Sequence, residues 1–203
     1  MSFLSLVGVE FKKIKRSKIF LILFAATVIL WIPSILNADM NFNMQAEGIS
    51  PENNFFIQGF MGMAWFMFPA SMVVGTVLLS QTERTNKGIL KMLALSISTV
   101  KLCLAKFVVL LALAASQILM MVGMYYISAA IVTGTQDYNF ILSPLFVFKE
   151  VGFIAVSTIP MLAFFWLLAV CIQTPIFSIG IGLASIVPSV LMINTKAWFA
   201  YPM

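Results

Sequence analysis

The sequence is poor in polar chemistry: it contains no histidine, and only 9% of its 203 residues are charged. A soluble domain carries charge on about a quarter of its residues, so this chain has too few charges to cover a water-exposed surface. The missing histidine removes the commonest zinc and haem ligand and the usual general base of enzymes. The two cysteines, Cys103 and Cys171, lie in or beside apolar segments, which predicts buried thiols in place of a disulfide framework.

Several catalytic and nucleotide-binding signatures are also missing. The sequence contains no Gly-x-x-x-x-Gly-Lys-Ser/Thr, no His-Glu-x-x-His and no Gly-x-Ser-x-Gly. We therefore expect the chain not to be an enzyme and to have no catalytic, cofactor-binding or metal-binding residue. Its 14 methionines could serve a Cu(I) pathway, but packing by a flexible apolar side chain is the favoured interpretation.

Long apolar runs dominate what is present. Hydrophobic residues make up 62% of the chain, and an apolar run of about 20 residues can cross a bilayer as a helix. The pattern predicts an all-α, polytopic transmembrane bundle formed by a single domain over residues 1–203. The third run is longer than a perpendicular crossing needs, so its start is expected along the interface, with Lys106 reaching the headgroups. The predicted spans are 19–36, 58–80, 102–132, 151–171 and 176–193.

The basic residues are distributed unevenly along the chain. Five lie within 12–18 and five within 84–106, whereas only Lys149 and Lys196 fall on the other side of the predicted spans. By the positive-inside rule this bias places the N-terminus in the cytosol, in a bacterial plasma membrane. The same distribution argues against nucleic-acid binding, which needs a basic face on a soluble fold. Because an odd number of spans would leave the C-terminus outside, we expect that a sixth span is missing after Met203.

Residues 1–18 have the pattern of an amphipathic helix that lies in the membrane interface. Glu10 and several cations lie between apolar residues at helical spacing, namely Phe3, Leu6, Val7, Phe11 and Ile14. The alternative is a simple extension of the first span. The predicted interfacial anchors are Lys12, Lys13, Lys15, Arg16 and Lys18.

The loop between the first two spans is acidic. It carries Asp39, Glu47 and Glu52 and no cation. These carboxylates could gather a cationic peptide or a divalent ion, but an ordinary solvated loop is the favoured interpretation.

The stretch from Gln81 to Lys101 carries the clearest functional signal. The charge distribution places it in the cytosol, yet its centre is rich in apolar residues such as Ile89, Leu90 and Leu93. Apolar side chains in this number need a membrane surface or a protein partner. A short helix of this kind can sit in a groove of a soluble subunit and transmit its movement.

The same stretch resembles the cytosolic motif of type-2 ABC exporter permeases. In that family a Glu and a Gly open the motif, and a Lys closes it at the start of the third span. The resemblance implies that 81–101 is the coupling segment, which docks on a separate ATP-binding cassette ATPase that holds ATP and Mg²⁺. This sequence departs from the family at Ser96, where a Pro is usual. The residues that carry the motif are Glu83, Gly88, Leu90, Leu93, Ser96, Lys101 and Lys106.

Within that family, the small size and the ending from Asn194 to Pro202 resemble lantibiotic-immunity permeases. This resemblance implies a second permease subunit, identical or different, and the export of amphipathic antimicrobial peptides from the lipid bilayer. One alternative is a permease for another cargo, such as a drug, a lipid-linked glycan or a metal-related substrate. Another is a non-transporting membrane scaffold or a small channel, although the scarcity of intramembrane charge disfavours the channel.

Overall fold

The computed structural model describes residues 3–16, 18–84, 98–172 and 174–192. Regular structure within these ranges is helical throughout, without a strand, which confirms the predicted all-α fold class. The elements are α1 (Phe3–Arg16), α2 (Ile19–Leu36), the 3-10 helix η1 (Ala38–Glu47), α3 (Pro51–Gly62), the π-helical turn η2 (Met63–Met67), α4 (Phe68–Arg84), α6 (Thr99–Gln136), α7 (Pro144–Cys171) and α8 (Pro175–Met192).

Four helical segments of the described chain are long and apolar enough to cross a membrane: Ile19–Leu36, Pro51–Gln81, Thr99–Gln136 and Pro144–Cys171. At ~1.5 Å per residue the 18 residues of α2 reach ~27 Å, close to the ~30 Å of a bilayer's hydrocarbon core. The chain is therefore a multi-pass membrane protein. The apolar part of α8 is shorter, Pro175–Pro188, so a fifth crossing stays a prediction. The expected sixth span concerns residues beyond the described part.

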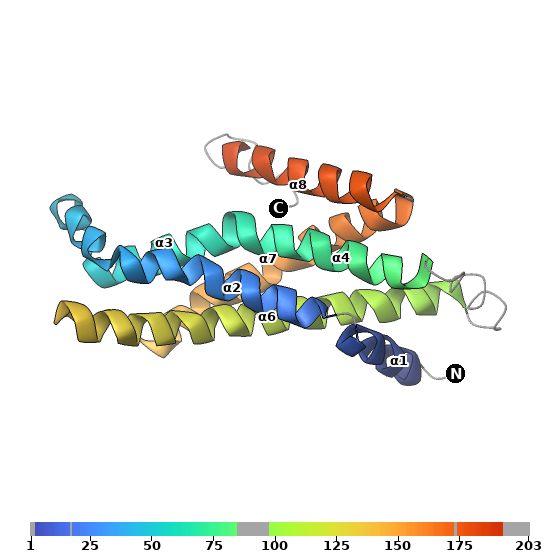
Figure 1. Cartoon of the computed structure of the whole chain (residues 1–203), viewed down its shortest axis with the longest axis horizontal. Coiled ribbons are helices and arrows are strands. Elements are labelled where there is room, and N and C mark those ends of the chain that lie inside the picture. Colours follow the sequence, from blue (N-terminus) through green and yellow to red (C-terminus); the bar gives the residue numbers. More distant parts are fainter. Residues whose placement is uncertain (1–2, 17, 85–97, 173, 193–203) are drawn as a thin grey trace.

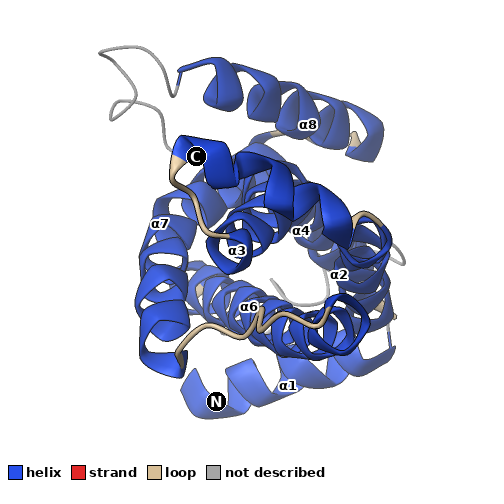
Figure 2. Cartoon of the chain, turned by 90° about the vertical axis from the view of Figure 1, so that its left-hand side faces the viewer, coloured by secondary structure: helices blue, strands red, loops and turns tan. Residues whose placement is uncertain are grey.

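The long helices α2, α4, α6 and α7 run along the length of the molecule (Figure 1). At one end lie α1, the start of α2, the end of α4 and the start of α6. This end carries Lys12, Lys18 and Lys101 and is termed the basic end; η1 and the loop between α6 and α7 lie at the opposite end. Seen along the bundle, α8 lies outside the other helices (Figure 2), against α4. A Cβ atom at Gly182 would lie 2.7 Å from Val73 Cγ1, so glycine permits this close approach.

Several helices extend beyond the predicted spans. α6 is one continuous helix of 38 residues, or ~57 Å. The expectation that Lys106 reaches the headgroups is wrong, because its side chain lies among helices and the residue is only 3% exposed. Residues 133–150, which lie between the third and fourth predicted spans, are helical up to Gln136 and again from Pro144. Asp137, with a left-handed φ of 51°, ends α6.

The sulfur-containing side chains follow two patterns. Cys103 and Cys171 are free and exposed on the outside of their helices, so the prediction of buried thiols is wrong. A lipid-facing position and a core position are equally apolar, which explains why the sequence does not separate them. Met63, Met72 and Met121 are buried in the core, in agreement with a packing role.

The π-helical turn η2 joins α3 to α4. The N–H of Phe68 donates to the C=O of Met63, five residues earlier. Pro69 gives a physical reason, because a proline ring in a regular α-helix collides with the carbonyl four residues before it. Here that carbonyl belongs to Trp65, and the wider turn gives it room. The segment Pro51–Gln81 therefore continues as one apolar helical unit despite its proline.

Aromatic side chains fill the core between α2, α3 and α6. The ring of Trp31 is fully buried, and its centroid lies 6.0 Å from that of Phe55 and 5.9 Å from that of Phe60. The Tyr125 ring lies 6.0 Å away on α6. Tilted and edge-on pairs of this kind contribute about 0.5–1.5 kcal/mol each beyond their burial. Gly59 lets α3 approach the cluster closely, since a Cβ atom there would lie 2.5 Å from the Trp31 ring.

Gly59→Ala should therefore destabilise the protein. The new methyl group overlaps the Trp31 ring, and overpacking of a core costs about 1–3 kcal/mol. The gain of about 1 kcal/mol from alanine in a helix offsets part of this cost. We expect the midpoint of thermal unfolding in detergent to fall by a few degrees, at ~2–4 °C per kcal/mol. Gly123→Ala is the control, because nothing lies within 4 Å of its Cβ position; equal midpoints for the two variants would contradict the overlap.

Candidate coupling site at the basic end

α1 packs against α6 through one narrow face. Leu6, Glu10 and Ile14 are buried on it, whereas Phe3 and Phe11 are 39% and 43% exposed. The sequence pattern grouped Glu10 with the cations between the apolar residues, but in the structure it lies at the centre of the buried face. The burial of this carboxylate makes the contact between α1 and α6 a specific one.

α1 is a separate helix and not an extension of the first span. Lys18 follows it with a left-handed φ of 57°, a conformation that interrupts a right-handed helix. α2 then starts at Ile19 in a new direction. The N-terminal helix is thus free to lie across the end of the bundle.

The carboxylate of Glu10 joins α1 to α6. Its Oε2 accepts a hydrogen bond from Lys106 Nζ at 3.0 Å, and its Oε1 accepts one from Lys13 Nζ at 2.6 Å. Glu10 is 1% exposed and Lys106 is 3% exposed. Because a buried charge without a partner costs several kcal/mol, each of these two side chains requires the other. The pair therefore fixes the position of α1 on α6.

Two more helix ends converge on this site. α4 ends at Arg84 and α6 begins at Thr99, both at the basic end (Figure 1), so the predicted coupling segment connects them. Glu83 lies in the last turn of α4, and Lys101 is exposed in the first turn of α6. The side chains of two motif residues are described, Lys101 and Lys106, and of these only Lys106 is seen to join another element. The other motif residues lie outside the described part: Gly88, Leu90, Leu93 and Ser96.

The predicted interfacial anchors divide into two groups. Lys13 is drawn toward Glu10 and is partly buried. Lys12, Lys15 and Lys18 are exposed, and their contact with lipid headgroups stays a prediction. For Arg16 only the backbone, at the end of α1, is described.

Sequence reasoning missed the role of Glu10, although a signal was present. Leu6, Glu10 and Ile14 recur every four residues, which is the spacing of one helix face. A carboxylate on an otherwise apolar helix face predicts a buried cation as its partner. Lys106, at the beginning of a long apolar run, was the candidate partner.

The opposite end of the bundle is held by tyrosine hydroxyls. Tyr125 of α6 donates to the C=O of Phe140 at 3.2 Å and accepts from the N–H of Leu142 at 3.0 Å. Tyr138, in the same loop, donates to Glu52 Oε2 at 2.5 Å. This bond to a carboxylate, together with some burial, raises the pKa of the Tyr138 phenol. The α6–α7 loop is thus tied both to α6 and to the start of α3.

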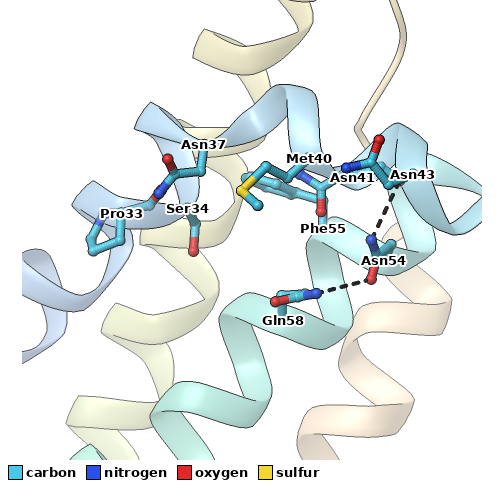
Figure 3. A pocket seen from close by; sticks show the side chains of 9 residues that line it. All are labelled: Pro33, Ser34, Asn37, Met40, Asn41, Asn43, Asn54, Phe55 and Gln58. Carbon is cyan, nitrogen blue, oxygen red and sulfur yellow. Dashed lines mark hydrogen bonds between the residues drawn. The ribbon is translucent and has the colours of Figure 1, made fainter.

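A pocket of about 360 Å³ lies at this end, beside α2, η1 and α3 (Figure 3). Its lining is uncharged and rich in amides. Asn54 donates to the C=O of Asn41 at 3.3 Å and accepts from Gln58 Nε2 at 3.4 Å. The first of these bonds holds η1 against α3, and both occupy part of the lining's hydrogen-bonding capacity.

Asp39 and Glu52, the two acidic residues of the first loop whose side chains are described, do not line that pocket. Asp39 is exposed, Glu52 accepts the Tyr138 hydroxyl, and only the backbone of Glu47 is described. Among the described residues, no three His, Cys, Asp or Glu side chains stand close enough together to hold a metal ion. The solvated-loop interpretation therefore fits Asp39, while Glu52 has a structural bond.

One polar pair ties two helices within the bundle. Ser71 of α4 and Gln117 of α6 are buried, and Ser71 donates to Gln117 Oε1 at 2.7 Å. Such bonds between transmembrane helices contribute about 0.6–2 kcal/mol. Sequence reasoning did not single out this pair, because each residue is isolated within an apolar run.

Together these features define a multi-pass helical membrane protein whose basic end is built around a buried ion pair. A family model described as ABC-2 family transporter protein matches residues 6–189. The match runs from α1 into α8, so the chain belongs to this family, and the resemblance to type-2 ABC permeases is confirmed at that level. Membership implies a bilayer and an ATPase partner. No curated protein and no solved structure matches the chain.

Breaking the ion pair from one side should destabilise the protein more than removing both charges. Lys106→Met leaves the buried Glu10 carboxylate without its buried partner, and we expect the free energy of unfolding in detergent to fall by about 3 kcal/mol. Glu10→Gln combined with Lys106→Met should recover most of that loss, because no buried charge remains.

The matched control is Lys101→Met, which makes the same change at an exposed position of the same helix. It should alter the free energy of unfolding by less than about 0.5 kcal/mol. Equal stability of the Lys106→Met and Lys101→Met variants would show that the ion pair does not hold α1 in place.

Tyr125→Phe should loosen the α6–α7 loop. The substitution leaves the C=O of Phe140 and the N–H of Leu142 unpaired, at a cost of about 1–3 kcal/mol in unfolding free energy. Faster hydrogen exchange of the loop amides would locate the effect. Tyr126→Phe is the control, since its hydroxyl is buried without a hydrogen-bond partner in the described chain. A loss of stability in the control as large as in Tyr125→Phe would refute this role of the Tyr125 hydroxyl.

Proposed function

We propose that this chain is the membrane-spanning permease subunit of an ATP-driven ABC exporter. Its partner is an ATP-binding cassette ATPase that holds ATP and Mg²⁺, and the chain itself carries no catalytic residue or cofactor. A second permease subunit, either a copy or a relative, completes the transporter in a bacterial plasma membrane. The family match over residues 6–189 supports this proposal, and the positive-inside rule favours a cytosolic basic end.

The observation that carries the coupling role is the convergence of α1, α4 and α6 at the basic end. Glu10 and Lys106 hold α1 on α6, and residues 81–101 connect α4 with α6. A push by the ATPase on this segment would act on both spans directly, and on α1 through the ion pair. Because packed helices shift as units, the movement would be carried along α6 to the opposite end.

The proposed cargo is a cationic, amphipathic antimicrobial peptide of the lantibiotic kind, which the exporter removes from the bilayer. The ending from Asn194 to Pro202 supports this cargo by resemblance. The charge of the opposite end supports this cargo as well. Asp39, Glu52 and Asp137 lie at that end, and Lys149 is its one cation in the described chain. An acidic outer end attracts a cationic peptide by long-range electrostatics.

Substitutions in the coupling segment test the proposal. Glu83→Ala and Gly88→Trp should lower the amount of ATPase that co-purifies with the chain, and should lower peptide resistance by roughly tenfold or more, because they alter the opening residues of the docking segment. Glu150→Ala and Gly123→Trp are the matched controls. They make the same changes at the opposite end and at an open position of α6.

The outcomes separate the rival functions. An ATPase that co-purifies without any peptide resistance would point to another cargo. A purified chain that retains no ATPase would favour a non-transporting scaffold and overturn the exporter proposal. If Glu83→Ala and Gly88→Trp behaved like their controls, the coupling role of residues 81–101 would be wrong.

A further inference from the structure

A second, larger pocket of about 820 Å³ lies between α1, α2 and α6. α2 supplies aromatic wall residues, Phe20 and Phe24, and α6 supplies Leu113. Lys15 and Lys18 also line it, from the end of α1 and from the turn that follows. Apolar walls with two cations distinguish this pocket from the uncharged, amide-lined pocket at the opposite end.

The charged and apolar lining residues lie at different depths of the bundle. Lys15 and Lys18 precede the first residue of α2 and so belong to the basic end. Phe24 lies six residues beyond Lys18 along the chain, or ~9 Å inward. Leu113 lies seven residues beyond Lys106 on α6, or ~10 Å inward. A ligand that fits this arrangement has an anionic head at the basic end and an apolar tail that runs into the hydrocarbon layer.

The two cations are available for such a head. The buried carboxylate of α1, on Glu10, is engaged by Lys13 and Lys106. Lys15 and Lys18 are exposed and form no ion pair with a carboxylate of the described chain. The left-handed conformation of Lys18 turns the chain between α1 and α2, so the two lysines line the same pocket from either side of that turn.

We propose that this pocket binds one anionic phospholipid, with its phosphate at Lys15 and Lys18 and an acyl chain along Phe20, Phe24 and Leu113. Basic pockets between transmembrane helices suit anionic headgroups, and the apolar wall suits the tail. A zwitterionic lipid would gain less from the lysines. The proposal does not depend on the identity of the cargo or of the ATPase.

Lipid titrations of the purified full chain in detergent test the site. Phosphatidylglycerol should raise the midpoint of thermal unfolding in a saturable way, because a ligand that binds the folded state stabilises it. Phosphatidylcholine should raise it far less, and glycerol phosphate, which has the same anionic group without a tail, should not raise it. Native mass spectrometry should find one anionic phospholipid retained per chain.

Two variants separate the head contacts from the tail contacts. Lys15→Gln combined with Lys18→Gln should raise the phosphatidylglycerol concentration at half-saturation roughly tenfold or more, whereas Lys149→Gln, the same type of change at an exposed position of the opposite end, should leave it unchanged. Ala112→Phe narrows the apolar part of the pocket and should reduce the response while both lysines remain.

Four results would overturn the proposal. Equal stabilisation of the unchanged protein by phosphatidylglycerol and phosphatidylcholine would show that the two lysines do not select an anionic headgroup. The same half-saturation concentration in the double lysine variant and in Lys149→Gln would show the same. A full response to glycerol phosphate would indicate a simple anion site. A change of oligomeric state in Ala112→Phe, measured by size-exclusion chromatography, would show that a second copy occupies the pocket.

Discussion

Polar groups that this chain removes from water are stabilised by partners inside the protein, because lipid tails offer them no hydrogen bonds. Helices satisfy the backbone, and the side chains follow the same constraint. Thr27 and Thr76 donate to carbonyls four residues earlier in their own helices. Tyr125 donates to the α6–α7 loop, and Glu10 is paired with Lys106. An apolar side chain tolerates many neighbours, whereas each of these bonds requires one particular partner. Where such a bond joins two elements, as that of Glu10 with Lys106 does, it therefore determines which faces make contact.

The two ends of the bundle meet this constraint in different ways. At the basic end the strongest link between elements is one ion pair between Glu10 and Lys106, whose charges are almost completely removed from solvent. At the opposite end several hydroxyl and amide hydrogen bonds join the elements, among them those of Tyr125, Tyr138 and Asn54. A single neutral hydrogen bond is worth about 1 kcal/mol. The basic end is thus sensitive to one change, while the opposite end can lose a bond and persist.

The sequence predicts the helical fold well, because hydrocarbon thickness sets the length of an apolar run. It predicts helix ends less well, since α6 continues past its predicted span to Gln136, where water can satisfy the side chains, and α7 already begins at Pro144, before its predicted span. It does not reveal which apolar face meets protein and which meets lipid, as Cys103 and Cys171 illustrate. The partners at the basic end, Glu10 and Lys106, are 96 positions apart. Only the packing of α1 on α6 brings them together.

Because of the π-helical turn from Met63 to Met67, the number of residues between α3 and α4 affects how both helices pack. A π turn holds one residue more than the α-helical turn it replaces, and one residue corresponds to ~100° of rotation about the helix axis. Phe55 and Phe60 face the Trp31 cluster before this turn, and Val73 meets Gly182 of α8 after it. Loss of one residue between them would rotate one of these faces away from its neighbour. The aromatic core and the α4–α8 contact are therefore held in phase by the number of residues that separate them.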